Sequence, residues 1–448
     1  MEITKTLAAY GASLRFEQIP PEIVRVAEER ILDNLGAAFA GVSYWPYATA
    51  LLKALPADGD AGVFAQRGKR NACLDAAFLN STLTHAVELD DGHKNAGCHA
   101  GAVVVPTALL LGRMEERSAE DILTAIVVGY EIEYRIAAAA SPLLIDRGFH
   151  PSTACAAFGA AATAAKIKGL DEEAFAAALA LAGAFTSGLK QMSKSAPMAK
   201  AIAVGNAASN GVRAALLAAQ GVTGPMDIME GPFGFFSLLS DGERAPQTTT
   251  HLGSTWLIAD TYVKLYPTCR HTHPAIEGLI ELTKDVSPEE IQEIDVGMYR
   301  VAHDATAKFF MPHNAGEAKF STPFCSALAV SEGSVGLGHM DGAWLTSPKL
   351  LALAQKVRMT VDPAVESLFP KVRGARVKVK LVSGEVREKQ VNELKGSPTM
   401  PASWEELVLK FGANSRDCLS GEMADRIVDI IDSFTTKDQL QQLWALIF

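Results

Sequence analysis

Residues 85–101 read H-A-V-E-L-D-D-G-H-K-N-A-G-C-H-A-G and connect two apolar helical patterns, at 72–84 and 103–114. The stretch contains three carboxylates, Glu88, Asp90 and Asp91, and three histidines, His85, His93 and His99, with Lys94 among them. Its three glycines allow the backbone to turn sharply and to approach a ligand closely. A loop of this composition between apolar helices favours a catalytic site, whereas a solvated interhelical loop is the plain alternative.

The whole chain has the composition of an ordinary folded protein. Its 448 residues are 48% hydrophobic and 21% charged, and the length favours two domains. The net charge of −10 argues against nucleic acid or an anionic membrane as the main partner. No apolar run reaches the length of a membrane span, and we expect no signal peptide. The six scattered cysteines lack a C-x-x-C pair, so we expect reduced thiols in a cytoplasmic protein.

Residues 1–265 are predicted to be almost entirely helical. Pro20-Pro21 opens a helical pattern that runs to residue 40, and Ser118 is the expected N-cap of the next long helix. Helical patterns then cover 118–140, 152–168, 170–185 and 200–220. Several of these patterns are apolar on more than one face, which is typical of helices buried in a bundle. The excess of apolar surface also favours a homodimer.

After about residue 265 the pattern changes to a mixture of helix and strand. A capping box at Ser287–Glu290 precedes a strand-like run at 294–300. Residues 376–382 and 385–391 flank Ser383-Gly384, and their alternation predicts a β-hairpin. Ser403 is expected to cap a return to helix. The expected fold class is mostly α: a helical domain from residues 1–265 and 400–448, with an inserted α+β lid domain at 266–399.

Two stretches in the helical part carry further candidate groups. Residues 147–153, R-G-F-H-P-S-T, place His150 before Pro151 and a helix start, where unpaired backbone N–H groups favour anions. A structural histidine is the alternative there. Residues 188–200 carry Lys190, Lys194 and Lys200, and a solvated loop is the alternative. Against it, Lys200 begins a nearly apolar helix, where a charge counts for more.

Two more stretches lie in the α+β part. Residues 264–274 read K-L-Y-P-T-C-R-H-T-H-P and carry four basic groups at the expected domain boundary: Lys264, Arg270, His271 and His273. Clefts between domains are a preferred place for ligands. A His-x-His pair can ligate a metal, but a mixture of His and Arg favours anions over cations. Residues 317–324, E-A-K-F-S-T-P-F, place polar groups at a helix start.

Together these stretches resemble the motifs of the MmgE/PrpD family, in the same order. The matching segments are E-L-D-D-G-H with a following H-A-G, G-F-H-P-S-T, K-A-I-A-V-G-N-A-A, K-L-Y-P-T-C-R-H-T-H and A-K-F-S-T-P-F. The family contains 2-methylcitrate dehydratases, cis-aconitate decarboxylases and an iminodisuccinate epimerase. The resemblance covers nearly the whole chain. It implies a helical domain made from both chain ends, an inserted α+β lid, an active site between the domains, a homodimer, and no metal or organic cofactor.

The resemblance also implies a set of site residues. The candidate catalytic residues are His99, His150, Glu88, Asp91 and Lys200. The candidate substrate-binding residues are Lys264, Arg270, His271, His273, Asp90 and Lys194. Three positions depart from relatives such as the decarboxylase. Glu88 stands where those relatives have Asp, and Phe324 stands where they have Tyr. The relatives also have a polar Thr near the position of Gly92. Each of these positions is a candidate contact to substrate.

The implied chemistry is proton transfer at the carbon next to a carboxylate of a small di- or tricarboxylate. Cations must then stabilise the charge that develops on that carboxylate, and a base must reach the carbon. We expect His99 and His150 to act as acid and base, because their ordinary pKa lies near neutrality. Glu88 or Asp91 would orient a histidine or act as its partner. A hydro-lyase is the first expectation.

Several alternatives remain open at the level of sequence. An epimerase or other isomerase, or a decarboxylase, would use the same residue types on a similar acid. A non-catalytic binding protein with the same fold is disfavoured, because every ionisable site position is filled. Asp90-Asp91 also suggests a metal-dependent helical enzyme of the terpene-synthase type. That reading needs a second metal-binding motif and an aromatic-lined pocket, and the Ala-rich helices offer neither.

Overall fold

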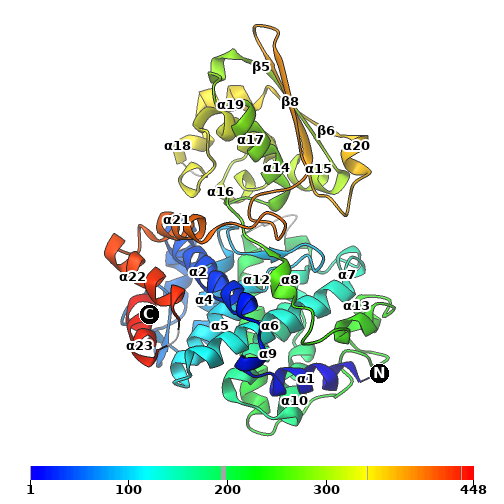
Figure 1. Ribbon diagram of the computed structural model, residues 1–448, viewed down its shortest axis with the longest axis vertical. Helices are drawn as coiled ribbons and strands as arrows, with labels where there is room; N and C mark the ends of the chain where they lie inside the picture. The colour runs from blue at the N-terminus through cyan, green and yellow to red at the C-terminus, as the bar shows by residue number, and fades with distance from the viewer. Residues whose placement is uncertain (1, 193–197, 341, 435) are drawn as a thin grey trace. The chain divides into compact units, whose positions relative to one another are not determined.

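The computed structural model describes residues 2–192, 198–340, 342–434 and 436–448 (Figure 1). The chain forms two compact units, of which the larger is Met1–Val263 with Ser403–Phe448 and the smaller is Lys264–Ala402. The larger unit is nearly all helix, and the smaller combines helices with a sheet. The predicted fold class, mostly α with an inserted α+β part, is confirmed.

The larger unit is built around seven long helices. They are α2 (Pro21–Tyr44), α4 (Cys73–His85), α5 (Gly101–Met114), α6 (Ala119–Ala140), α9 (Ala156–Lys168), α10 (Glu172–Ala184) and α12 (Ala199–Ala218). Helix α12 packs closely against both α4 and α9. A Cβ on Gly205 of α12 would lie 2.0 Å from Oγ1 of Thr82 on α4, so only glycine allows this approach. Small residues therefore set the spacing of the central helices.

Shorter helices and the chain's C-terminal helices complete the larger unit. The short helices are α1 (Ile3–Ser13), α3 (Ala48–Ala54), α7 (Leu143–Asp146), α8 (Pro151–Ala154) and α13 (Phe235–Leu239). The C-terminal helices are α21 (Trp404–Ser415), α22 (Gly421–Asp432) and α23 (Lys437–Ile447). Helices α21 and α22, in orange and red, pack against the blue α2 (Figure 1). Within the described ranges, no helix is both long and apolar enough to cross a bilayer.

Two helix starts follow the predicted capping chemistry, and one predicted helix is interrupted. Ser118 accepts from the N–H of Asp121, and Ser403 accepts from that of Glu406, each in a capping box. The helix predicted over 152–168 is instead α8 followed by α9. At Cys155 the ladder changes, because the N–H of Phe158 bonds the carbonyl three residues back. Pro151 fits the first turn of α8, where its missing N–H is no loss.

Two pairs of very short strands also occur in the larger unit. Strand β1 (Ala61–Gly62) pairs with β2 (Arg70–Asn71), and β3 (Gly92–His93) pairs antiparallel with β4 (Thr261–Tyr262). The second pair joins the loop between α4 and α5 to a segment about 170 positions later in the chain. Two-residue strands have no alternation to detect, so the sequence did not predict this pairing.

The smaller unit contains a four-stranded sheet in the order β6-β5-β7-β8. The strands are β5 (Ile291–Met298), β6 (Val357–Val361), β7 (Ala375–Leu381) and β8 (Val386–Val391). Strands β5 and β6 are parallel, the other pairs are antiparallel, and the predicted β7–β8 hairpin is confirmed. The sheet packs on α14 (His273–Leu282) and α17 (Thr322–Glu332). The other α-helices of the smaller unit are α15 (Arg300–Thr306), α16 (Ala315–Ala318), α18 (Gly342–Leu345), α19 (Pro348–Ala354) and α20 (Pro363–Glu366).

Candidate active site

The loop between α4 and α5 is buried within the larger unit. Asp90 and Asp91 have no exposed surface, and Glu88 is 7% exposed. Burying a carboxylate is unfavourable unless charged or hydrogen-bonding groups surround it. The solvated-loop alternative is therefore wrong, and the partners of these three side chains define the site.

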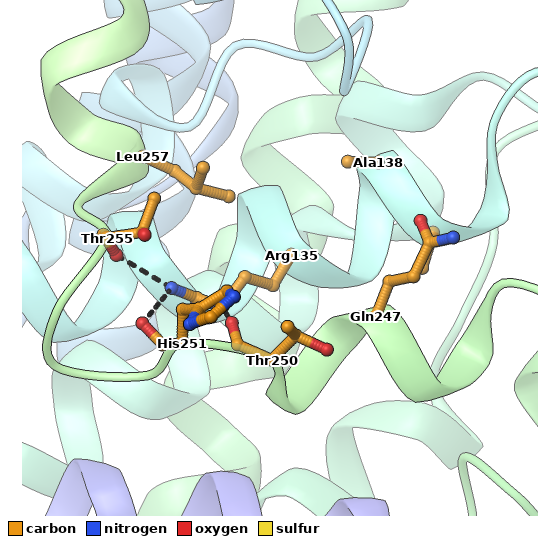
Figure 2. A pocket seen from close by; sticks show the side chains of 8 residues that line it. Arg135, Ala138, Gln247, Thr250, His251, Thr255 and Leu257 are labelled. Atoms are coloured by element: carbon orange, nitrogen blue, oxygen red, sulfur yellow. Dashed lines mark hydrogen bonds between the residues drawn. The ribbon is translucent and has the colours of Figure 1, made fainter.

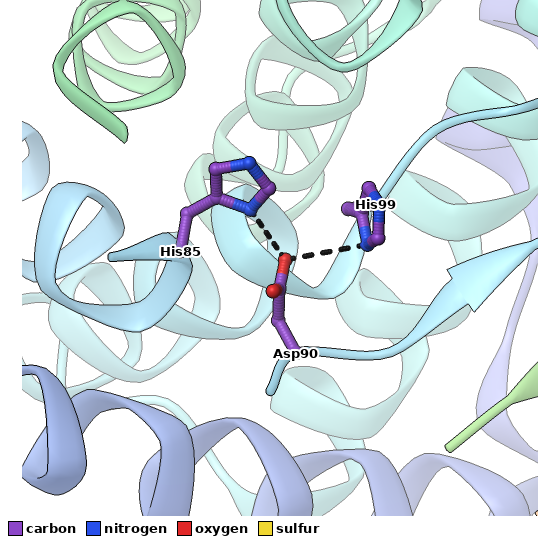
Figure 3. A group of neighbouring side chains, drawn as sticks. All are labelled: His85, Asp90 and His99. Carbon is purple, nitrogen blue, oxygen red and sulfur yellow. Dashed lines mark hydrogen bonds and ion pairs between the residues drawn. The ribbon is translucent and has the colours of Figure 1, made fainter. Parts of the chain in front are cut away.

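Asp90 lies between two histidines (Figure 3). Its Oδ2 is 2.6 Å from Nδ1 of His85, the last residue of α4, and 3.5 Å from Nδ1 of His99. Nδ1 of His99 also lies 2.6 Å from the backbone carbonyl oxygen of Asp91. A carbonyl oxygen only accepts, so Nδ1 of His99 carries a proton and Nε2 is the atom that can exchange one.

The same three side chains are the group that best matches a metal site in the described part of the chain. Their candidate ligand atoms all lie within 4.8 Å of one another. Two ligands of one tetrahedral zinc ion, each bound at about 2.1 Å, would lie about 3.4 Å apart. The 2.6 Å separation of His85 Nδ1 and Asp90 Oδ2 is shorter and is that of a hydrogen bond. The geometry of these side chains thus fits a shared proton better than a shared ion.

Lys200 and Glu88 form an ion pair next to this group. The Nζ of Lys200, on the first turn of α12, lies 2.6 Å from Oε1 of Glu88. Their side chains are only 8% and 10% exposed, so the pair is held away from bulk water. Glu88 adopts the left-handed conformation, with φ of 59°, which a glutamate rarely adopts. Such backbone strain is typical of functional sites. The structure thus brings together two predicted residues that are 112 positions apart.

His150 is the residue before α8, as the sequence predicted. Burial, and then the positive charges of Lys200, His85 and His99, hold its pKa well below the ordinary value, while Glu88 acts in the opposite direction. Its Nδ1 is buried and has no hydrogen-bond partner among the described residues. His150 is therefore a neutral imidazole at neutral pH, and a neutral imidazole can accept a proton.

Asp91 contacts the helices behind the loop. The hydroxyl of Tyr130 on α6 donates to its Oδ2 at 2.9 Å, and the amide of Asn34 on α2 donates to its Oδ1 at 3.3 Å. Burial raises the pKa of Asp91 to about 7, although the charge of Arg30 lowers it. Asp91 thus reaches His99 through its backbone carbonyl, while its carboxylate holds the loop to α2 and α6.

The C-terminal part of the chain supports the same loop. Lys410 on α21 donates to Oδ1 of Asp33 at 2.5 Å and to the carbonyl oxygen of Leu89 at 2.9 Å. Burial lowers the pKa of Lys410, and Asp33 opposes that effect. Lys410, Asp33, Asn34 and Tyr130 were not predicted from the sequence, and His85 was noted in the 85–101 stretch without a role in the site. The available signal was the place of Arg30, Asp33 and Asn34, which lie beside the apolar residues of the buried face of α2.

The predicted residues of the smaller unit form their own group. Lys264 and His273 are buried. Arg270 lies 3.2 Å from Nδ1 of His273 and donates to Oγ of Ser397 at 2.9 Å. Nδ1 of His271 contacts the hydroxyl of Tyr299, and burial lowers the pKa of His271 to about 3. Substrate binding by these four residues stays a prediction. Lys194 lies outside the described residues.

A small cavity of about 180 Å³ lies beside α6, and none of the predicted site residues lines it (Figure 2). Its lining includes Arg135, Gln247, Thr250, His251, Thr255 and Leu257. The guanidinium of Arg135 donates to the carbonyls of Thr250 and Thr255 at 2.6 and 2.7 Å, and its Nε donates to Glu131 at 3.1 Å. Because its donors are largely satisfied by the protein, Arg135 holds a loop in place and is poorly suited to bind an anion.

Comparison with known families identifies the chain. Residues 5–248 match the model of the MmgE/PrpD N-terminal domain, and residues 266–436 match that of the MmgE/PrpD C-terminal domain. The chain belongs to the MmgE/PrpD family. The resemblance inferred from five short motifs is thus confirmed, and the protein is an MmgE/PrpD-type enzyme.

Relatives within the MmgE/PrpD family match over almost the full chain. The chain is 27% identical to a cis-aconitate decarboxylase-like protein of Aspergillus oryzae, over 99% of this chain and 97% of the relative. It is 25% identical to the cis-aconitate decarboxylase of Mus musculus, over 99% of this chain and 93% of the relative. The corresponding values for that of Homo sapiens are 25%, 99% and 94%. The alignments therefore include the loop of residues 85–101 and both compact units.

Proposed function

We propose that the protein is a cofactor-independent lyase that acts on a small di- or tricarboxylate. The leading candidate among lyases is a hydro-lyase. The main observation behind this proposal is that two histidines in unlike environments lie close enough to influence each other's charge. His150 is held neutral and can take a proton, whereas His99 lies beside the carboxylate of Asp90 and can give one. An elimination of water needs one base and one acid, and these two residues supply them.

The steps of the elimination follow from these contacts. A nitrogen of His150 takes the proton from the carbon next to a substrate carboxylate. The electron pair left behind spreads onto that carboxylate, where the ammonium group of Lys200 stabilises the developing charge. This electron pair then forms the carbon–carbon double bond as hydroxide leaves the neighbouring carbon. Nε2 of His99, when protonated, supplies a proton to the hydroxide, and Asp90 stabilises the imidazolium before that transfer.

A decarboxylase is the second candidate, and the full-length relatives named as cis-aconitate decarboxylases favour it. In that reaction the bond from carbon to a carboxylate breaks and carbon dioxide leaves. The electron pair stays on carbon, and His99 protonates it. An epimerase would instead return the proton to the opposite face of the same carbon. The elimination and the epimerisation use both the acid and the base, whereas the decarboxylation needs only the acid.

The products formed from a panel of acids distinguish the three reactions. The purified protein is incubated with methylcitrate, citrate, cis-aconitate, citramalate and aspartate-derived acids, beside His150→Ala. We expect the mass of one acid to fall by one water, and the variant to be inactive. Loss of carbon dioxide would establish the decarboxylase instead, and inversion without a mass change would establish the epimerase. A folded protein that changes none of these acids would contradict the proposal.

We further propose a homodimer in a reducing, cytoplasmic setting. Leu189, Phe233 and Leu238 of the larger unit are 67%, 86% and 56% exposed, and large apolar side chains at such exposure favour a covered surface. All six cysteines are free, which supports a reducing compartment. Light scattering after size exclusion tests the dimer, and a monomer at micromolar concentration would contradict it.

A further inference from the structure

Tyr262 and His99 converge above a single glycine. Tyr262 lies directly opposite Gly92 in the β3–β4 pair. A Cβ on Gly92 would lie 2.5 Å from the hydroxyl oxygen of Tyr262 and 3.1 Å from Nδ1 of His99. The two rings are nearly perpendicular, at 88°, with centroids 6.4 Å apart. The phenol and the imidazole therefore occupy the space that any side chain at position 92 would need.

The backbone that carries Tyr262 is firmly anchored. The hydroxyl of Thr261 accepts from Nη1 of Arg30 at 3.1 Å and donates to the carbonyl oxygen of Ile258 at 2.8 Å. Arg30 lies on α2, the helix that also holds Asp91 through Asn34. One helix thus fixes both the loop of residues 85–101 and strand β4. The position of the Tyr262 hydroxyl relative to His99 follows from this shared support.

The exposure of these side chains indicates from which side a ligand reaches the site. His85, Asp90 and Asp91 are buried. His99 and Tyr262 are both partly exposed. A molecule that approaches Nε2 of His99 therefore comes first to the two rings and not to the carboxylates behind them. A phenol is an uncharged donor, so it can meet an anionic ligand beside Asp90 and Glu88 without adding another negative charge.

We propose that the Tyr262 hydroxyl contacts the substrate and donates a hydrogen bond to an oxygen of the carboxylate next to the carbon that loses its proton, while the leaving hydroxyl of the same acid lies at Nε2 of His99. This assignment rests on the proposed function. In the reaction the negative charge on that carboxylate grows, so a donor fixed in advance strengthens its bond as the transition state is reached. Gly92 then acts as a positioning residue, because its lack of a side chain leaves the space to the Tyr262 hydroxyl.

Four variants test the assignment. Tyr262→Phe removes the hydroxyl and keeps the ring. Gly92→Ala places a methyl group where the hydroxyl lies, and the end of a side chain can move aside without unfolding the protein. The third variant combines the two. Tyr44→Phe is the matched control, because it removes a hydroxyl from the end of α2, where it accepts from Arg416 at 3.1 Å.

Turnover and binding are both measured. The kcat/KM is determined for the acid that the wild-type protein converts, and calorimetry gives the affinity for tricarballylate, a tricarboxylate with no hydroxyl group to eliminate. We expect Tyr262→Phe and Gly92→Ala each to lower kcat/KM by about 10- to 100-fold, as for a hydrogen bond to a charged group. The double variant is expected to lose less than the two single effects combined, because the methyl group then has no hydroxyl to displace, although it still crowds the ring and Nδ1 of His99. Both variants should bind tricarballylate more weakly, with an unchanged melting temperature for Tyr262→Phe and a small decrease for Gly92→Ala, whose methyl group must push the ring aside.

The outcomes separate this inference from the proposed function. An active wild-type protein whose Tyr262→Phe variant retains full kcat/KM and full tricarballylate affinity would overturn the role of Tyr262 alone. Losses that simply add in the double variant would overturn the role of Gly92 in placing the hydroxyl. A wild-type protein that converts no acid and binds no tricarballylate would contradict the proposed function itself, and this inference with it.

Discussion

Oδ2 of Asp90 lies 2.6 Å from Nδ1 of His85 and 3.5 Å from Nδ1 of His99, so one carboxylate oxygen contacts two imidazoles. His85 is the last residue of α4, and His99 lies just before α5. Asp90 therefore connects the two ends of the loop between these helices. A charge shared in this way fixes the rings and stabilises an imidazolium. Asp90 was predicted to bind substrate, and its contacts give it a second role in positioning the acid.

Removing this charge should impair catalysis more than folding. Asp90→Asn keeps the size of the side chain but cannot stabilise a protonated His99. We expect kcat to fall by about 10²- to 10⁴-fold, the range for loss of general acid–base catalysis. Steady-state kinetics with the converted acid measures the effect, and circular dichroism confirms the fold. A variant with wild-type kcat would show that Asp90 has no part in the acid's function.

Breaking the ion pair of Lys200 and Glu88 should affect stability and turnover differently. Lys200→Met leaves Glu88 charged and buried without its cation, which destabilises a protein by about 3–5 kcal/mol. The double variant Lys200→Met/Glu88→Gln removes both charges and should recover most of the stability. It should remain inactive, because the cation near the developing charge is absent. Urea unfolding and activity assays distinguish the two effects, and recovery of turnover in the double variant would refute the role of Lys200.

A buried carboxyl group on α6 should make stability depend on pH. Burial raises the pKa of Glu133 to about 8, from an ordinary value of 4.5. The folded protein thus holds a proton that the unfolded chain releases, and the free energy of unfolding falls as pH rises from 4.5 to 8. Glu133→Gln should have little effect on stability at pH 5. At pH 9 it should stabilise the protein by a few kcal/mol, because a pKa change of one unit corresponds to about 1.4 kcal/mol.

Denaturant unfolding at these two pH values tests this expectation. The exposed Glu243→Gln serves as the control, since it removes a carboxyl group that is already in contact with water. The same stabilisation by Glu133→Gln at both values would mean that packing, and not ionisation, explains it.

The pH profile of activity should reflect the environment of His150. Because burial and nearby positive charges hold its pKa well below 6.5, the base stays unprotonated as the solution becomes mildly acidic. The acid limb of kcat/KM, which reports the free enzyme, should therefore lie below pH 6.5. A profile that declines already at or above that value would indicate that His150 is not the base, or that it is more exposed to water.

Chelators should leave the activity unchanged. The separation of His85 Nδ1 and Asp90 Oδ2 is that of a hydrogen bond and is too short for two ligands of one ion. We expect dialysis against EDTA to preserve kcat, and elemental analysis of the active protein to find less than one equivalent of any transition metal. Loss of activity that zinc or iron restores would place an ion on His85, Asp90 and His99.

Much of the fold could be predicted from local signals. Ser118 and Ser403 carry their capping partners three residues away, and Gly384 marks the β7–β8 turn, so short windows of sequence were sufficient. The break between α8 and α9 was missed, because every residue near Cys155 is compatible with a helix. The parallel pairing of β5 with β6 was also missed, since strands about 60 positions apart leave no local mark.

Many residues of the candidate site could be predicted from the sequence, but the contacts between them could not. The motif that holds Glu88 and the one that holds Lys200 each suggested a functional group, but only the fold brings the two together. The contact of Lys410 with Asp33 joins residues 377 positions apart. The approach of Tyr262 to Gly92 depends on a two-residue strand pair. These contacts arise from tertiary packing, which residue spacing does not encode.

The entry of deuterium into the substrate is the most direct test of proton transfer at this site. The converted acid is incubated in D2O with the wild-type protein and with His150→Ala, and proton NMR follows the hydrogen on the carbon next to the carboxylate. We predict that deuterium appears at that carbon with the wild-type protein and not with the folded variant. No deuterium at that carbon after the wild-type protein has brought the acid and its product to equilibrium, or equal exchange by His150→Ala, would contradict the account.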